Sequence, residues 1–316
     1  MFALPLTLLM TTGCESSEDD VGFRRGGSVQ YVTVVDTWEA TGLDLIFFGD
    51  TSGSMALELE TMGENALTFM GRLDEFNSNW QLIVVTGWDG CGVNGILSHD
   101  VPDYDQVFAA ALRTPPEPDA VDAGADEWGL HNVEQAIQAS VEGGCNEGFL
   151  REGALLHIVF LSDEMDTSPG WDSGDELYWQ EYVDAIIAAR TRPPSAKPDD
   201  PMVTFSAVVG PNPGGCAEAD PGIGYTDAVD YTGGSFLSIC DDWYNQLDSL
   251  VYSSVQLVDF PLSEEPVESS LSVVVDGAER TTGWEYQSSE NRVHFTESAP
   301  TIGEEISISY QTVVDG

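Results

Sequence analysis

A carboxylate and two hydroxyl groups stand close together in the sequence, where a short apolar run ends. Asp50, Ser52 and Ser54 follow that run directly, and Gly53 lets the backbone turn sharply between the two serines. Hard cations such as Mg²⁺ prefer oxygen ligands of this kind in near-octahedral geometry and usually keep some water. The spacing predicts a divalent-cation site; the alternative is an ordinary turn in which Asp or Ser caps the next helix.

The flanking residues predict the elements that position this loop. Leu43–Phe48 is an apolar strand, and apolar residues recur at helical spacing from Met55 to about Asn77. The pattern Asp-x-Ser-Gly-Ser between a strand and a helix resembles the metal-ion-dependent adhesion site (MIDAS) of von Willebrand factor type A (VWFA) domains. The resemblance extends over residues 36–255, because the elements expected there follow the same plan.

Strands and helices alternate along that region. The expected strands are Gln81–Thr86, Val93–Ser98, Leu155–Leu161, Met202–Val209 and Ser235–Ile239, and the expected helices are Asp105–Leu112, Leu130–Val141, Glu176–Arg190 and Asp242–Ser253. This alternation predicts an α/β fold with a doubly wound, Rossmann-like and mostly parallel sheet over residues 28–255. Short strands without helices predict a small C-terminal antiparallel β-sandwich over residues 256–316, which residues 28–36 could complete.

A second acid-rich loop is expected beside the first. The strand Leu155–Leu161 ends in Ser162-Asp163-Glu164, and the carboxyl ends of parallel strands gather at one edge of a sheet. Asp163 is therefore expected at the same edge as Asp50. Glu164 and Asp166 could form a second cation site, or they could belong to a solvated loop.

The resemblance to the adhesion-site family implies a role for each of these residues. Ser52 and Ser54 would bind the cation directly, while Asp50 and Asp163 would orient water molecules and neutralise charge. The implied cofactor is Mg²⁺, with Mn²⁺ or Ca²⁺ as alternatives.

The second loop of the family's site differs in this chain. The family carries a Thr there, whereas this sequence offers Asp126 and Glu127. Either carboxylate could replace the Thr; it would bind the cation more tightly and leave it a weaker electrophile toward an acidic ligand. Alternatively, Asp126 only caps the helix that follows.

The composition is strongly acidic. The 316 residues include 55 Asp and Glu against 10 Lys and Arg, a net charge of −45. Such a surface repels nucleic acid and anionic membranes. The charge is spread along the chain, so we expect it to reflect a saline habitat more than cation binding alone.

The N-terminal segment resembles a targeting signal. Met1–Cys14 is a short apolar stretch that ends in small residues before a cysteine, and it resembles a bacterial lipoprotein signal peptide. The resemblance implies lipidation of Cys14 and export to a bacterial cell envelope, with a lipid anchor in the outer membrane; an ordinary secretion signal is the alternative. Residues 15–27 are acidic and poor in apolar side chains, which predicts a flexible tether.

Without Cys14, four cysteines remain, an even number that suits two disulfides in an oxidising compartment. Cys216 and Cys240 bracket a loop and a strand late in the main domain, and Cys91 and Cys145 then pair by elimination. No CxxC spacing is present, so a structural zinc site is not expected.

The expected function is that of a tethered binding module. Its cation would keep an open coordination position for a carboxylate of a partner protein. The alternative is a structural or assembly component of the envelope whose cation only stabilises the fold. An enzyme is not expected, because the sequence has no Gly-x-Ser-x-Gly elbow and its four histidines form no metal-binding pair.

Overall fold

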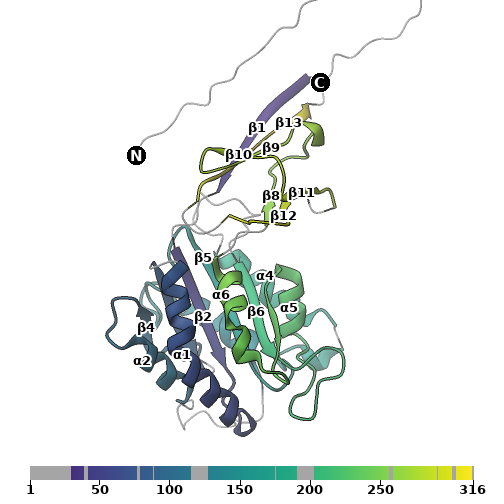
Figure 1. Ribbon diagram of the computed structural model, residues 1–316. Helices are drawn as coiled ribbons and strands as arrows, with labels where there is room; N and C mark the ends of the chain where they lie inside the picture. Colours follow the sequence, from purple (N-terminus) through teal and green to yellow (C-terminus); the bar gives the residue numbers. More distant parts are fainter. Residues whose placement is uncertain are drawn as a thin grey trace, which may run out of the picture.

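The computed structural model describes residues 30–38, 42–76, 79–87, 89–114, 127–174, 176–190, 203–255, 259–289, 291–300 and 304–314. The predicted signal segment with Cys14, the predicted tether 15–27 and Asp126 lie outside these residues. The described residues form an α/β domain and a smaller domain of antiparallel strands, called the β domain below (Figure 1).

A six-stranded sheet forms the centre of the α/β domain. Its strands are β2 (Gly42–Gly49), β3 (Trp80–Val85), β4 (Val93–Ser98), β5 (Ala154–Leu161), β6 (Val203–Val209) and β7 (Phe236–Ser238). Their order is β4-β3-β2-β5-β6-β7, and all neighbours are parallel except β3 and β4. The sheet is thus mixed and mostly parallel, with β4 as the antiparallel edge strand.

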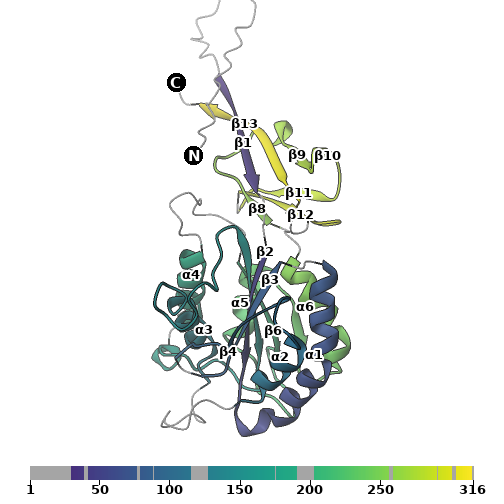
Figure 2. The same ribbon diagram turned by 90° about the vertical axis from the view of Figure 1, so that its left-hand side faces the viewer.

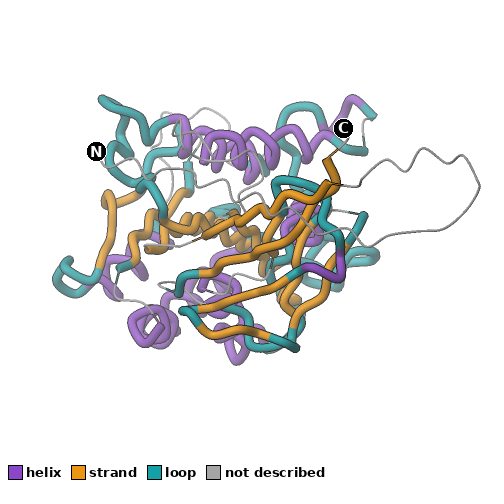
Figure 3. The backbone as a smooth tube through the Cα atoms, turned by 90° about the horizontal axis from the view of Figure 1, so that it is seen from above, coloured by secondary structure: helices purple, strands orange, loops and turns teal. Residues whose placement is uncertain are grey.

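Helices cover both faces of this sheet (Figure 3). On one face lie α1 (Ala56–Phe76), α2 (Tyr104–Leu112) and α6 (Leu247–Val255), and on the other lie α3 (Gly129–Gln138), α4 (Tyr178–Arg190) and α5 (Tyr225–Thr232). Every residue of β2 is buried, as expected for a strand covered on both sides. Among the described residues, no helix combines the length and the apolar character that a membrane span requires.

Two antiparallel sheets form the β domain. One has the order β1-β13-β9-β10 and the other the order β11-β12-β8. Their bounds are β1 (Gln30–Trp38), β13 (Ile306–Val314), β9 (Ser272–Val275), β10 (Ala278–Arg280), β11 (Trp284–Gln287), β12 (Arg292–Phe295) and β8 (Asp259–Pro261). β1, from the start of the chain, therefore lies in a sheet otherwise built from its end, because it pairs with β13 over all nine residues.

The β domain lies beyond the end of the six-stranded sheet at which β2 begins (Figures 1 and 2). The carboxyl ends of the parallel strands therefore point away from the β domain. The apolar core that includes α1 continues into the β domain through Phe260, Val273 and Ile308.

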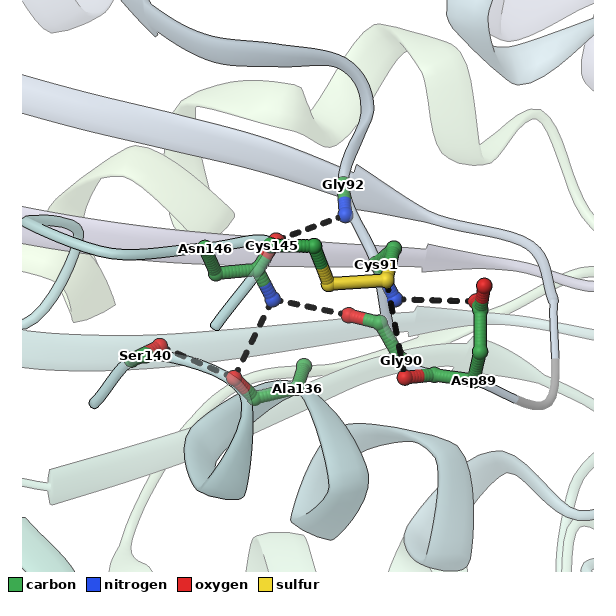
Figure 4. The surroundings of a disulfide bond; sticks show 8 residues. All are labelled: Asp89, Gly90, Cys91, Gly92, Ala136, Ser140, Cys145 and Asn146. Carbon is green, nitrogen blue, oxygen red and sulfur yellow. Dashed lines mark hydrogen bonds between the residues drawn. A yellow bond between two sulfur atoms is a disulfide. The ribbon is translucent and has the colours of Figure 1, made fainter. Parts of the chain in front are cut away.

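Two disulfides fasten the loops of the α/β domain. They join Cys91 to Cys145 and Cys216 to Cys240, the pairing expected from the sequence. Beside the first, the buried Asn146 side chain donates hydrogen bonds from Nδ2 to the carbonyls of Gly90 (2.8 Å) and Ala136 (3.1 Å) (Figure 4). Its Oδ1 accepts a hydrogen bond from the N–H of Gly92 (2.8 Å). The turn before β4 is thus bound to the loop that follows α3 both covalently and by hydrogen bonds.

Candidate functional site

Asp50 lies directly after β2, and hydrogen bonds fix it to the end of β5. Its N–H donates to the carbonyl of Leu161 (3.0 Å). Its Oδ1 accepts the N–H of Ser52 (2.7 Å), and its Oδ2 accepts the hydroxyl of Ser162 (2.8 Å). The side chain is only 2 % exposed. The ends of β2 and β5 are therefore joined, at the point where the strand order of the sheet reverses, the usual place for a ligand in such folds.

The two serines lie at the start of the helix that follows. The Oγ atoms of Ser52 and Ser54 are 3.0 Å apart. Ser52 occupies the N-cap position of the 3₁₀ turn Gly53–Met55, which leads into α1, but its side chain makes no capping hydrogen bond. The Ser52 hydroxyl therefore faces that of Ser54 rather than capping the helix.

Asp163, which follows β5, lies with Asp50 and the two serines. Its side chain is 8 % exposed, and its Oδ1 is buried without a hydrogen-bond partner. Burial raises the pKa of this carboxyl; the Ser54 hydroxyl opposes the shift and the charge of Asp50 adds to it. The structure thus brings Asp50, Ser52, Ser54 and Asp163 together at one edge of the sheet.

Glu127 enters the same site from the loop before α3. Its backbone is fixed by Thr167, whose hydroxyl accepts the N–H of Glu127 (2.9 Å) and whose N–H donates to the carbonyl of Glu127 (2.7 Å). Burial raises the pKa of Glu127 to about 8, and the charges of Asp50 and Glu164 add to this shift. Of the two carboxylates that the sequence offered for the second loop, Glu127 therefore faces Asp50, while Asp126 lies outside the described residues.

The cluster extends to two further carboxylates. Burial raises the pKa of Glu164, and the charges of Asp50 and Asp163 add to this shift. Glu58, on the first turn of α1, has a buried Oε2 atom without a hydrogen-bond partner. Among the ion pairs of the described residues, none involves these carboxylates. The negative charge at this edge is therefore not balanced by any described side chain.

Asp166 has a different role from the two that the sequence suggested. It is fully buried, and its Oδ1 accepts the N–H of Leu130 (2.9 Å) in the first turn of α3. Ser168, which donates to the same carboxylate, accepts the N–H of His131 (3.0 Å). Asp166 and Ser168 thus cap α3 from another loop. Asp166 belongs neither to a second cation site nor to a solvated loop.

The loop after β6 is hydrogen-bonded to the residues that follow β5. The N–H of Asp220 donates to the carbonyl of Asp163 (2.8 Å), and the N–H of Asp166 donates to the carbonyl of Ile223 (3.0 Å). The disulfide Cys216–Cys240 fastens this loop to the end of β7. The sequence alone does not assign this loop to the site, because nothing in the composition of the loop indicates which strand end it covers.

The site offers both hydroxyl and carboxylate oxygens as possible metal ligands. Within the described ranges, no group of three or more His, Cys, Asp or Glu side chains is arranged to hold a metal ion by itself. A cation at this edge would therefore depend on the hydroxyls of Ser52 and Ser54 as well as on carboxylates. The pair of hydroxyls and the unpartnered Oδ1 of Asp163 fit such an ion, since hard cations take neutral and charged oxygens together.

Comparison with known proteins gave matches only among solved structures. No protein-family model and no curated protein matches the sequence. The chain is similar in fold to a von Willebrand factor type A protein from Catenulispora acidiphila, with 14 % identity, a TM-score of 0.42, 93 % of this chain covered and 68 % of that one. It is also similar to the pilus adhesin RrgA from Streptococcus pneumoniae, with 10 % identity, a TM-score of 0.36, 90 % of this chain covered and 58 % of that one.

A third similarity is to proximal thread matrix protein 1 from the mussel byssus. It has 14 % identity and a TM-score of 0.40, and covers 70 % of this chain. The chain spans 48 % of the length of that protein. Similarities at these identities and TM-scores carry no information on function.

Proposed function

We propose that this chain is an exported interaction module that holds a divalent cation at the Asp50 edge of its sheet and uses it to capture an acidic group of a partner protein. The observation that carries the proposal is the buried Oδ1 atom of Asp163, which has no hydrogen-bond partner although Asp50 and Ser54 lie beside it. Leaving one oxygen of a buried carboxylate without a hydrogen-bond partner is costly. A cation would supply the missing partner.

The proposed roles of the residues follow from their hydrogen bonds. Ser52 and Ser54 have their hydroxyl oxygens side by side and would bind the ion directly. Both oxygens of Asp50 already accept hydrogen bonds within the protein, so Asp50 would act through water. Mg²⁺, Mn²⁺ or Ca²⁺ would offset the clustered charge and leave a coordination position for the partner's carboxylate.

The proposed location is a bacterial cell envelope. The resemblance of Met1–Cys14 to a lipoprotein signal supports a lipid anchor at Cys14, and the two disulfides support an oxidising compartment. The net charge of −45 argues against nucleic acid as a partner. Mass spectrometry of membrane-extracted protein should detect the lipid, and Cys14→Ser should shift the protein to the soluble fraction. A wild-type protein that is soluble and unmodified would argue against the anchor.

A second function is favoured by one observation, the position of Glu127. Its buried carboxylate lies against Asp50 where the family carries a neutral Thr. A third carboxylate beside Asp50 and Asp163 would bind the cation more tightly, but it would weaken attraction to an incoming acid. In that case the cation would stabilise the domain and take no part in binding.

The first experiment tests whether the site binds a cation. After treatment with EDTA, addition of Mg²⁺, Mn²⁺ or Ca²⁺ should raise the melting temperature, because a ligand that binds only the folded state stabilises it by about 2.7 kcal/mol at about 100 times its Kd. Asp50→Ala should abolish this increase. Glu279→Ala removes an exposed carboxylate of β10, far from the site, and should keep it. Without an increase for any of the three cations in the wild type, the cation site is refuted.

The second experiment separates the two functions. Partner proteins retained from solubilised envelope should be lost with EDTA and with Asp50→Ala, and retained with Glu279→Ala. A folded Asp50→Ala variant that still retains its partner would leave the cation with a purely structural role.

A further inference from the structure

β1 is an exposed edge strand of unusual length. It is nine residues long and pairs on one side with β13; on its other side no strand pairs with it within the described part of the chain. The opposite edge of the same sheet, β10, has only three residues. Proteins usually protect long edges with lysine, proline or a bulge. The sequence of β1, QYVTVVDTW, has no lysine or proline, and its register with β13 is unbroken.

The surface along β1 is uncharged and carries several exposed apolar side chains. Tyr31 is 54 % exposed, Val35 57 % and Val313, on β13, 53 %. β1 and β13 together contain one charged residue, Asp36, which is 1 % exposed and accepts the hydroxyl of Tyr310 (2.8 Å). The net charge of the molecule is −45, so most of its surface repels another acidic molecule. The surface formed by β1 and β13 has no exposed charge and does not add to this repulsion.

We propose that β1 pairs with β1 of a second copy of this chain, antiparallel and with the two-fold axis at Thr33. In that register Tyr31 of one copy lies opposite Val35 of the other, and Thr33 lies opposite its own equivalent. These three residues share one face, since side chains alternate along a strand. Aromatic pairs with β-branched residues and Thr–Thr pairs both stabilise antiparallel strands. The contact is self-complementary, as a closed two-fold dimer requires.

This arrangement keeps the acidic α/β domains of the two copies apart. β1 begins at the end of the β domain that is remote from the six-stranded sheet and runs toward that sheet (Figures 1 and 2). Antiparallel pairing therefore places the two α/β domains at opposite ends of a continuous eight-stranded sheet, which is twice the order β1-β13-β9-β10. The repulsion that remains between the copies is long-range and is screened by salt.

The test is the oligomeric state of the full chain in a Cys14→Ser background, measured by sedimentation. We expect a dimer that forms with increasing protein concentration, is favoured by added NaCl and is unaffected by EDTA. Thr33→Asp places two carboxylates against each other on the two-fold axis and should give a monomer. Gln311→Asp adds the same charge to the same face on β13, directly opposite Thr33, and should remain dimeric.

A cross-linking experiment tests the register and does not require Thr33→Asp to fold. Under mild oxidation Thr33→Cys should form a disulfide-linked dimer, because opposed residues on antiparallel strands are close enough for this bond. Gln311→Cys should not. A wild-type chain that is monomeric at every protein and salt concentration would overturn the proposal. Equal cross-linking of the two cysteine variants, or a monomer that binds a foreign strand peptide along β1, would also overturn it.

Discussion

At the scale of single residues, the side chain of Glu127 determines how the site behaves without a cation. Its pKa is raised to about 8, first by burial and then by the charges of Asp50 and Glu164. Near neutral pH a proton on Glu127 therefore does part of what a cation would do. It lowers the charge of the cluster and allows a hydrogen bond between Glu127 and Asp50.

The stability of the cation-free protein should depend on the protonation of Glu127. The folded protein binds the Glu127 proton more tightly than the unfolded chain, whose carboxyl has the ordinary pKa of 4.5. Between pH 4.5 and about 8 the free energy of unfolding of the cation-free protein should therefore fall as pH rises. Thermal melts in EDTA should show this slope, and Glu127→Gln should reduce it. An equal slope in both proteins would show that Glu127 does not hold the proton.

The residues of the site differ in how far the sequence predicts them. Asp50, Ser52, Ser54 and Asp163 follow strand ends, so a local pattern and the rule for parallel sheets place them together. Asp166 could not be assigned in this way. Its partner, the N–H of Leu130, is 36 residues away, and only the packed fold brings the two together.

At the scale of elements, α3 depends on a cap supplied from another loop. Asp166 and Ser168 accept the N–H groups of Leu130 and His131, while Trp128, at the N-cap position, makes no side-chain capping bond. Asp166→Ala should lower the free energy of unfolding by about 1–3 kcal/mol, because buried N–H groups lose their partner. Denaturant titration measures the difference. Asp172→Ala, an exposed aspartate further along the same segment, should change little.

The disulfides allow a second prediction for elements. Cys91–Cys145 closes a sequence separation of 54 residues and Cys216–Cys240 one of 24. In the chain-entropy model these loops correspond to about 4 and about 3 kcal/mol of stabilisation. Urea titrations of the two paired Cys→Ala variants should show the larger loss for the first. The reverse order would indicate that the loop near Asp163 gains its stability chiefly from the second bridge.

The elements of the fold were largely predictable, since apolar periodicity indicates long strands and helices well. α5 was not predicted. Its sequence, YTDAVDYT, is rich in Tyr, Thr, Asp and Val, which are weak helix formers. The helix is set by its surroundings: Tyr225 is fully buried, and the Asp227 carboxylate accepts the N–H of Gly224 (2.8 Å), which has a positive φ of 87°. Tertiary packing, rather than intrinsic helix propensity, determines that such a segment is helical.

At the scale of the whole molecule, the net charge of −45 should make stability depend on salt. Repulsion between surface carboxylates favours expansion of the chain, and salt weakens it as the Debye length falls from about 30 Å at about 0.01 M to about 8 Å at about 0.15 M. The melting temperature in EDTA should therefore rise with NaCl. Asp50→Ala should show a similar rise, because monovalent salt acts on the whole surface. A melting temperature that does not change with salt would contradict this account.

The order of β1 and β2 along the chain has a mechanical consequence. β1 ends at Trp38 and β2 begins at Gly42 and runs to Gly49, so the covalent path from the N-terminal strand to Asp50 consists almost entirely of two strands. A pull between the start of β1 and a ligand held at Asp50 is therefore carried by the covalent backbone of two strands that are already extended, and it does not have to separate β2 from β3 or β5. Tension of this kind would be resisted by the central strand of the α/β domain, while its surface helices stay outside the line of force.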